Sequence, residues 1–129
     1  MSEAKRILIV EDDQFLREFY QELLQAEGYF VDTAADGEIG LSKIQQEVYN
    51  LILLDIMLPK KDGVQVLRDL KSASPKSANV TIVVLTNLGH DSVIKECFDL
   101  GADGYLIKSA LNPDQILTEV KSYLSKSNA

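Results

Sequence analysis

Several kinds of residue and segment are scarce in this chain, and each shortage removes a class of function. Cys97 is the single cysteine, so the chain can form neither an intrachain disulfide nor a cysteine-rich metal site. No apolar run approaches the roughly 18 residues of a membrane span, and residues 1–6 lack the hydrophobic region of a signal peptide. No basic block is present to bind a nucleic-acid backbone. We therefore expect a soluble, cytoplasmic protein with no direct contact to nucleic acid or membrane.

The composition is that of one globular domain. The chain has 129 residues, 46% of them hydrophobic and 26% charged, which is ordinary usage for a domain of this length. We expect a single domain over residues 1–129, with a core from about residue 5 to residue 125 and no output domain. The net charge of −7, from 20 acidic and 13 basic residues, indicates by itself only solubility.

Short apolar runs predict the strands of a parallel sheet. Three runs are continuous and rich in branched residues, which is typical of strands covered on both faces. They are Ile7–Val10, Leu51–Leu54 and Ile82–Leu85. Two weaker segments, Phe30–Ala34 and Tyr105–Ile107, fit the edges of the sheet, because the first contains an aspartate and the second is short.

Helical patterns occupy the segments between these strands. Apolar residues recur there at spacings of three and four, and Gly28 and Gly101 follow two of the patterns as stop signals. The marking positions of the five helices are Leu16, Phe19, Tyr20, Leu23 and Leu24; Leu41, Ile44 and Val48; Val66, Leu67 and Leu70; Val93, Ile94, Cys97 and Phe98; and Ile116, Leu117, Val120, Tyr123 and Leu124. The alternation predicts an α/β fold of the (βα)₅ type, with a doubly wound, five-stranded parallel sheet.

The order of the strands follows from their character. Strands 1, 3 and 4 are apolar enough for the interior, and consecutive strands are usually neighbours, so the simplest order is the flavodoxin-like 2-1-3-4-5. In that order the winding reverses between strands 1 and 3. The reversal opens a crevice at their carboxyl ends, which is where ligands bind in open α/β sheets.

Residues with reactive side chains follow the strands at or beyond this reversal, whereas the second strand ends in alanines. They are Glu11, Asp12 and Asp13 after the first strand, Asp55 after the third, Thr86 after the fourth and Lys108 after the fifth. Asp13 alone is interpreted as the N-cap of the first helix. Pro59 disfavours a helix directly after Asp55, so a capping role explains that aspartate poorly.

Three carboxylates that converge at adjacent strand ends repel one another. At about 4 Å and an effective dielectric near 20, each like-charged contact costs on the order of 4 kcal/mol. A hard divalent cation removes that cost, and carboxylate oxygens suit Mg²⁺. With Mg²⁺ bound, Asp55 could act as a nucleophile toward a phosphoryl group, while Lys108 supplies positive charge and Thr86 a hydroxyl donor.

These residues, in this order, resemble the receiver (CheY-like) domain of two-component response regulators. The resemblance covers nearly the whole chain and rests on four segments in register with the strands: Ile7–Asp12, Leu53–Pro59 with Gly63, Val84–Thr86 and Gly104–Lys108. It implies a phosphorylation-activated signalling switch and not a turnover enzyme. Asp55 would accept the phosphoryl group from a partner sensor histidine kinase or histidine phosphotransfer protein.

The resemblance also assigns the metal ligands. Asp12 would bind Mg²⁺ directly and Glu11 through water, with Asp55 and the backbone carbonyl of Met57 as further ligands. These assignments are carried over position by position from the family.

The resemblance assigns the switch residues as well. Thr86 and Lys108 would contact the phosphoryl oxygens, and Tyr105 matches an aromatic residue that turns inward when the threonine moves. Phosphorylation would then change the face formed by helix 4, strand 5 and helix 5. That face would bind a downstream protein target or serve a relay, in a monomer or a phosphorylation-dependent dimer.

Three departures from the family pattern bear on the site. Ser109 follows Lys108 where the family usually has proline after a cis peptide bond, which puts the reach of Lys108 in question. Asn87 follows Thr86 where smaller residues are common, and can restrict access to the phosphoryl group. Met57 and Leu88 occupy positions that tune the lifetime of the phosphoryl group, and we expect a lifetime that is not extreme.

Other functions remain open from the sequence. An aspartate-based phosphohydrolase would share Asp55 and Mg²⁺, but its familiar form has a second aspartate where this chain has Met57. A phosphorylation-independent interaction module commonly loses the acids or the lysine, all of which are present here. A flavodoxin is disfavoured because the loop after the first strand is acidic. His90, the sole histidine, is interpreted as a loop residue, so the phosphodonor histidine belongs to another protein.

Overall fold

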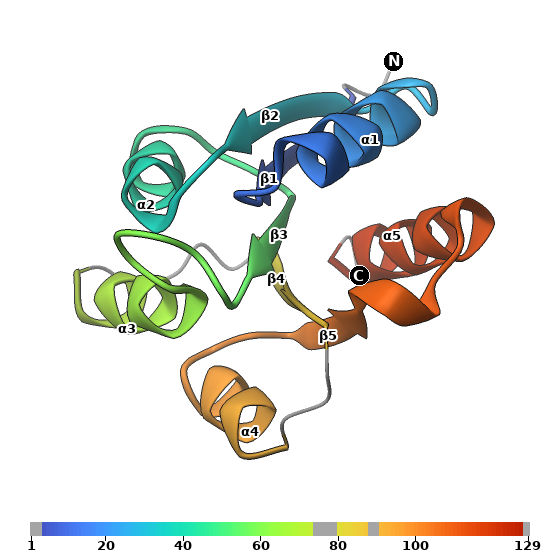
Figure 1. Cartoon of the computed structure of the whole chain (residues 1–129). Coiled ribbons are helices and arrows are strands. Elements are labelled where there is room, and N and C mark those ends of the chain that lie inside the picture. The colour runs from blue at the N-terminus through green and yellow to red at the C-terminus, as the bar shows by residue number, and fades with distance from the viewer. Residues whose placement is uncertain (1–3, 74–79, 88–90, 128–129) are drawn as a thin grey trace.

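Five parallel strands alternate with five α-helices along the residues that the computed structural model describes, which are 4–73, 80–87 and 91–127 (Figure 1). The strands are β1 Arg6–Val10, β2 Phe30–Ala34, β3 Leu51–Asp55, β4 Thr81–Thr86 and β5 Gly104–Ile107. The helices are α1 Gln14–Gln25, α2 Gly37–Gln46, α3 Gly63–Ala73, α4 Asp91–Asp99, a short 3₁₀ turn Lys108–Ala110 and α5 Pro113–Ser127.

The sheet has the strand order β2-β1-β3-β4-β5, with every neighbouring pair parallel. The predicted order is therefore confirmed, and β1 lies between β2 and β3 at the reversal of the winding. Val10 pairs with Leu54 and Asp55 pairs with Leu85, so the carboxyl ends of the three central strands finish at one edge of the sheet. That edge carries the residues singled out from the sequence.

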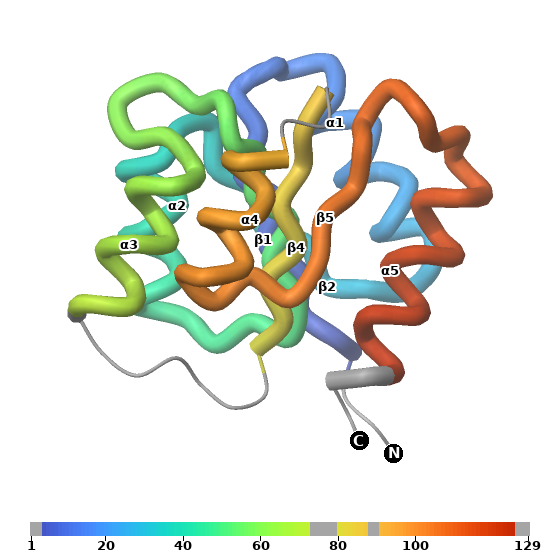
Figure 2. The backbone as a smooth tube through the Cα atoms, turned by 90° about the horizontal axis from the view of Figure 1, so that it is seen from below, coloured from blue at the N-terminus to red at the C-terminus, as the bar shows by residue number. Residues whose placement is uncertain are grey.

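Helices cover both faces of the sheet and divide the core into two layers. Helices α1 and α5 lie on one side, and α2, α3 and α4 lie on the other (Figures 1 and 2). Ile7 and Ile9 of β1 belong to the first layer, while Leu8 and Val10 belong to the second. Successive side chains of a strand point to opposite faces. This is why β1 is apolar at every position instead of alternating.

The predicted ends of α2, β3 and β4 are corrected by the structure. Val48 is not part of the second helix: α2 ends at Gln46, Glu47 is already extended, and the Val48 side chain is 74% exposed. Strands β3 and β4 continue one residue further than predicted, so Asp55 and Thr86 are their last residues.

Within the described part of the chain, no helix has both the length and the apolar character needed to cross a membrane.

Candidate functional site

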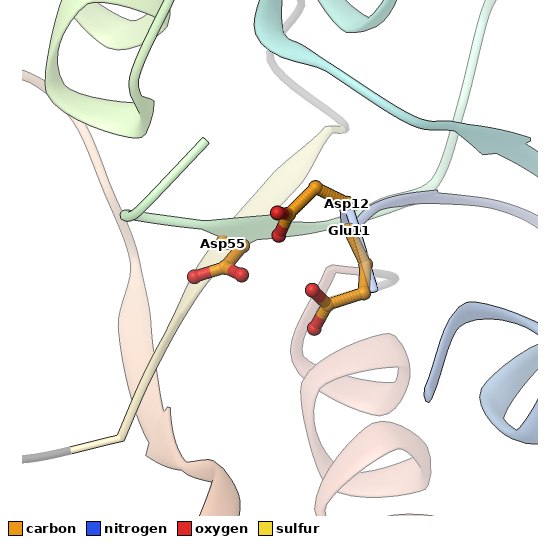
Figure 3. A group of neighbouring side chains, drawn as sticks. All are labelled: Glu11, Asp12 and Asp55. Carbon is orange, nitrogen blue, oxygen red and sulfur yellow. The ribbon is translucent and has the colours of Figure 1, made fainter. Parts of the chain in front are cut away.

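Three carboxylates meet at the carboxyl ends of β1 and β3 (Figure 3). Glu11 and Asp12 follow β1, and Asp55 ends β3. One carboxylate oxygen from each residue lies within 4.8 Å of those from the other two. Glu11 and Asp55 are 1% and 2% exposed, whereas Asp12 is open to solvent. The predicted convergence of these acids is therefore present in the fold.

Asp55 is held by the strand that it ends and by the turn that follows. All five residues of β3 are buried, and the Ile56 amide continues the ladder by donating to the Leu85 carbonyl at 3.1 Å. The Met57 amide then donates to Asp55 Oδ1 at 3.1 Å. At the start of α3, a Cβ on Gly63 would lie 2.6 Å from the Asp55 carbonyl oxygen, so a side chain there would displace the turn that supports this carboxylate.

Glu11 and Asp12 lie in the short connection between β1 and α1. The Glu11 amide donates to the Ala34 carbonyl at 3.0 Å and so extends the pairing of β1 with β2. Glu11 Oε2 accepts from the Asp13 amide at 3.1 Å. Asp13 in turn caps α1, accepting from the Leu16 amide at 3.1 Å, which confirms its interpretation as an N-cap. The Asp13 side chain therefore serves as the helix cap, whereas Glu11 and Asp12 lie beside Asp55.

Lys108 connects β5 to both buried acids. It follows β5 directly, and its Nζ donates to Glu11 Oε1 and to Asp55 Oδ2, each at 2.9 Å. Its side chain is only 8% exposed. The peptide bond to Ser109 is trans, and Ser109 Oγ donates to the Asn87 carbonyl at 3.4 Å. The missing proline therefore does not prevent Lys108 from reaching the acids.

Burial and the contact between Lys108 and the acids shift the pKa values of Lys108 and Glu11 in opposite directions. Burial lowers the pKa of Lys108, but its hydrogen bonds and charge contacts with Glu11 and Asp55 outweigh that effect, so the net pKa is raised. Burial is also the main reason that the pKa of Glu11 is raised, and the Asp55 charge adds to it, while Lys108 acts in the opposite direction. Lys108 is consequently a fixed positive charge at neutral pH.

The site has the charge and ligand chemistry to hold a hard divalent cation. When all four side chains are ionised, three carboxylates and one ammonium leave two negative charges in the group. Lys108 already places a cationic nitrogen between Glu11 and Asp55, which shows that positive charge is accommodated there. The metal-binding group consists of carboxylate oxygens, the ligands that Mg²⁺ prefers.

The remaining predicted residues surround this group in different ways. Thr86 is buried at the end of β4, next to β3 in the sheet. Met57 contributes its amide to Asp55, while its side chain is 78% exposed. Tyr105 in β5 is half exposed and packs edge-to-face on Phe98 of α4, with ring centroids 6.3 Å apart. Its ring therefore contacts α4 in this structure. The predictions for Leu88 and His90 lie outside the described residues.

Two neighbours of the acids were not predicted from the sequence. Arg17 in α1 donates from Nη1 to the carbonyl oxygens of Glu11 and Asp12, at 2.9 and 3.3 Å. The spacing of Asp13 and Arg17 matches an ordinary surface pair on a helix, so it gave no signal of this contact. Tyr20 lines an apolar pocket together with Lys108, and burial raises the pKa of Tyr20. The pocket is lined by Tyr20, Leu53, Leu85, Leu106, Lys108, Leu111 and Ile116.

Comparison with known proteins agrees with this fold and site. The response regulator receiver domain family matches residues 7–121. A probable transcriptional regulator, ycf27 of Guillardia theta, is 35% identical over 96% of this chain, and the chain spans only 47% of that protein's length.

Two solved structures have the same fold. A CheY-like receiver domain protein of Methanospirillum hungatei has a TM-score of 0.88 at 32% identity, with 98% of each chain covered. The receiver domain of the sensor histidine kinase PA1611 of Pseudomonas aeruginosa, with magnesium coordinated in its active site cleft, has a TM-score of 0.82 at 25% identity, covering 95% of this chain and 99% of that one. The family match over most of the chain, on a sheet of the expected order, leads to one conclusion: this protein belongs to the response regulator receiver domains of two-component systems.

Proposed function

We propose that this receiver domain is a Mg²⁺-dependent phosphoacceptor that takes a phosphoryl group on Asp55 from a partner histidine kinase or histidine phosphotransfer protein. The observation that carries the proposal is the buried Asp55 carboxylate, held by the Met57 amide and by Lys108 and adjacent to two further acids. A structural ion pair would need only one acid for one lysine. The additional acids leave negative charge in excess, which a divalent cation would balance.

The reaction forms one bond and breaks one bond. A carboxylate oxygen of Asp55 bonds to phosphorus while the phosphorus–nitrogen bond to the donor imidazole breaks, and the electron pair remains on that nitrogen. Bound Mg²⁺ would offset the charge of the phosphoryl oxygens. Glu11, Asp12, Asp55 and the Met57 carbonyl would hold it, and the magnesium in the cleft of the Pseudomonas receiver supports this assignment.

Lys108 and Thr86 are the proposed contacts of the phosphoryl oxygens. Lys108 Nζ is bonded to Asp55 Oδ2 at 2.9 Å, so it lies beside an oxygen that would carry the new group. The Lys108 ammonium can interact with the phosphoryl oxygens without a change in its own protonation. Thr86, buried at the end of the neighbouring strand, would then turn its hydroxyl toward the same oxygens.

Tyr105 is the proposed link between the site and a binding surface. Its ring packs edge-to-face on Phe98 and both side chains are partly exposed. Movement of the tyrosine inward would break that contact and change the face made by α4, β5 and α5. Such a change would shift the affinity for a downstream protein, because the partner would bind one arrangement better than the other.

Intact-mass measurement tests the proposal directly. The protein is incubated with Mg²⁺ and acetyl phosphate, and we expect one added phosphoryl group per chain. Asp55→Asn should abolish the addition and EDTA should weaken it. Asp62→Asn is the matched control, because an asparagine oxygen can still accept from the Gln65 amide at the start of α3. Modification that survives Asp55→Asn would overturn the assignment, and steady turnover of phosphate esters would favour a phosphohydrolase.

A further inference from the structure

Arg17 binds three consecutive carbonyl groups at the start of the site. Its Nη1 donates to the Glu11 carbonyl at 2.9 Å and to the Asp12 carbonyl at 3.3 Å. Its backbone amide donates to the Asp13 carbonyl at 2.9 Å, as part of the first turn of α1. One residue of α1 therefore fixes the whole connection that carries two of the three acids.

That connection has to adopt an unusual arrangement of side chains. Successive residues of an extended strand point to opposite faces of a sheet, yet adjacent Glu11 and Asp12 both place a carboxylate oxygen within 4.8 Å of Asp55. The chain must therefore depart from the regular strand conformation at Glu11 and Asp12, which follow the end of β1 at Val10. Arg17 binds the backbone carbonyls of these two residues, where the chain changes direction. It leaves the carboxylates themselves available to a cation.

We propose that Arg17 is a positioning residue that pre-organises Glu11 and Asp12 for Mg²⁺, an inference that rests on the function proposed above. Without the guanidinium, the connection would sample other conformations, and Mg²⁺ binding would have to order it. Removing a group that orients metal ligands typically weakens metal affinity about 10- to 100-fold. Arg17 acts through backbone carbonyls, so it differs from Lys108, which bonds to the carboxylate oxygens.

The sign of the effect separates this role from simple electrostatics. Arg17 carries a positive charge near the proposed cation, so charge alone predicts tighter Mg²⁺ binding when that charge is removed. A positioning role predicts weaker binding. The two explanations therefore lead to opposite changes in the dissociation constant for the same substitution.

Calorimetric titration of the unphosphorylated protein with Mg²⁺ makes this measurement. We expect Arg17→Met to weaken binding about tenfold, at the lower end of the usual range for such groups. Arg17→Lys keeps the charge with a shorter reach and should show a smaller loss. Arg68→Met is the control, because it removes the same charge from an exposed pair with Glu96. Binding to Arg17→Met that equals or exceeds that of the wild type would overturn the proposal.

Two further readouts separate positioning from loss of stability or of the proposed function. The Asp13 amide donates to Glu11 Oε2. Hydrogen exchange of this amide, measured without Mg²⁺, should accelerate in Arg17→Met. Autophosphorylation from acetyl phosphate should be slow at low Mg²⁺ and return to the wild-type rate at saturating Mg²⁺. Unchanged exchange, or a rate that stays low at saturation, would contradict the role.

The outcomes for the two proposals are distinct. A wild-type protein that binds no Mg²⁺ would refute the proposed function, and the Asp13 exchange rate would still decide whether Arg17 holds the connection. A wild type that binds Mg²⁺ together with an unaffected Arg17→Met would refute only the positioning role. If Arg17→Met fails to fold by circular dichroism, Arg17→Lys decides, since wild-type affinity in that variant would count against the need for the guanidinium.

Discussion

The charged side chains at the two ends of the sheet differ in their exposure to solvent. At the amino end, Arg6 pairs with Glu47 at 3.8 Å, and the two side chains are 37% and 56% exposed. Water screens such a pair, and it contributes little to stability. At the carboxyl end, Lys108 pairs with Glu11 and Asp55 in a site where all three side chains are almost completely buried.

The aromatic residues at the amino end extend this contrast. The Arg6 guanidinium lies 4.3 Å from the centre of the Phe30 ring and 5.7 Å from that of Tyr49, and Tyr49 donates its hydroxyl to Asp32 at 2.8 Å. The two aromatic rings stabilise the Arg6 charge, and the neutral Tyr49 hydroxyl stabilises the Asp32 carboxylate. At the carboxyl end, by contrast, burial and excess negative charge coincide, and an uncompensated buried charge is costly. Charge that is buried and left unbalanced therefore distinguishes the carboxyl end, where the candidate site lies, from the amino end.

The largest expected effect comes from removing the buried ammonium. Lys108→Met leaves Glu11 and Asp55 buried without their cation, and should lower the free energy of unfolding by about 3 kcal/mol without Mg²⁺. Added Mg²⁺ should recover part of the loss. Urea denaturation with and without Mg²⁺ measures both values. Lys121→Met, which removes an exposed partner of Glu27, should change stability little. Equal effects of the two substitutions would show that burial does not make the Lys108 charge more important than an exposed one.

A smaller effect of opposite sign is expected at the exposed acid. Asp12→Asn removes one of three converging negative charges and should raise the Mg²⁺-free stability by about 1 kcal/mol. The same variant should bind Mg²⁺ more weakly, since a ligand is lost. Urea denaturation and calorimetry together test this reversal, with Asp62→Asn as control. A less stable Asp12→Asn protein would show that the acids do not repel one another in the fold.

The pH dependence of stability should identify Glu11 as the acid whose ionisation is disfavoured in the folded protein. Its folded pKa is raised above the reference value of 4.5, first because of burial and then because of Asp55. From about that reference value up to the raised pKa, the folded state binds more protons than the unfolded state, so this group's contribution to stability falls as pH increases. The urea midpoint of the wild type minus that of Glu11→Gln should therefore decrease with rising pH, and a flat or rising difference would contradict the assignment.

The smallest effect is expected at the amino end. Glu47→Gln removes the acid that faces Arg6 across a partly exposed gap, and should change the free energy of unfolding by about 0.5 kcal/mol or less. Because this pair is remote from the acids of the carboxyl end, the change should be the same with and without Mg²⁺. A Mg²⁺-dependent change in Glu47→Gln would show that the two ends of the sheet are coupled.

Much of the fold followed from local patterns. The three continuous apolar runs became the three central strands, and the apolar periodicity located all five helices among the described residues. The prediction that Val48 belongs to the second helix was wrong, because apolar periodicity cannot show that the backbone becomes extended at Glu47. Similarly, the half-exposed Tyr105 and Phe98 are apolar positions whose contact depends on how α4 lies against β5.

The order of residues along the chain was enough to predict which reactive residues stand at the strand ends and therefore at which edge of the sheet they meet. Strand periodicity and strand order are sufficient for that, because a parallel sheet brings its carboxyl ends together. Three-dimensional packing was needed to show that Lys108 Nζ bridges Glu11 and Asp55 while its peptide bond to Ser109 is trans, and that Arg17 holds the carbonyls beside them. Such contacts depend on distances and side-chain directions between separate elements, which local residue patterns do not encode.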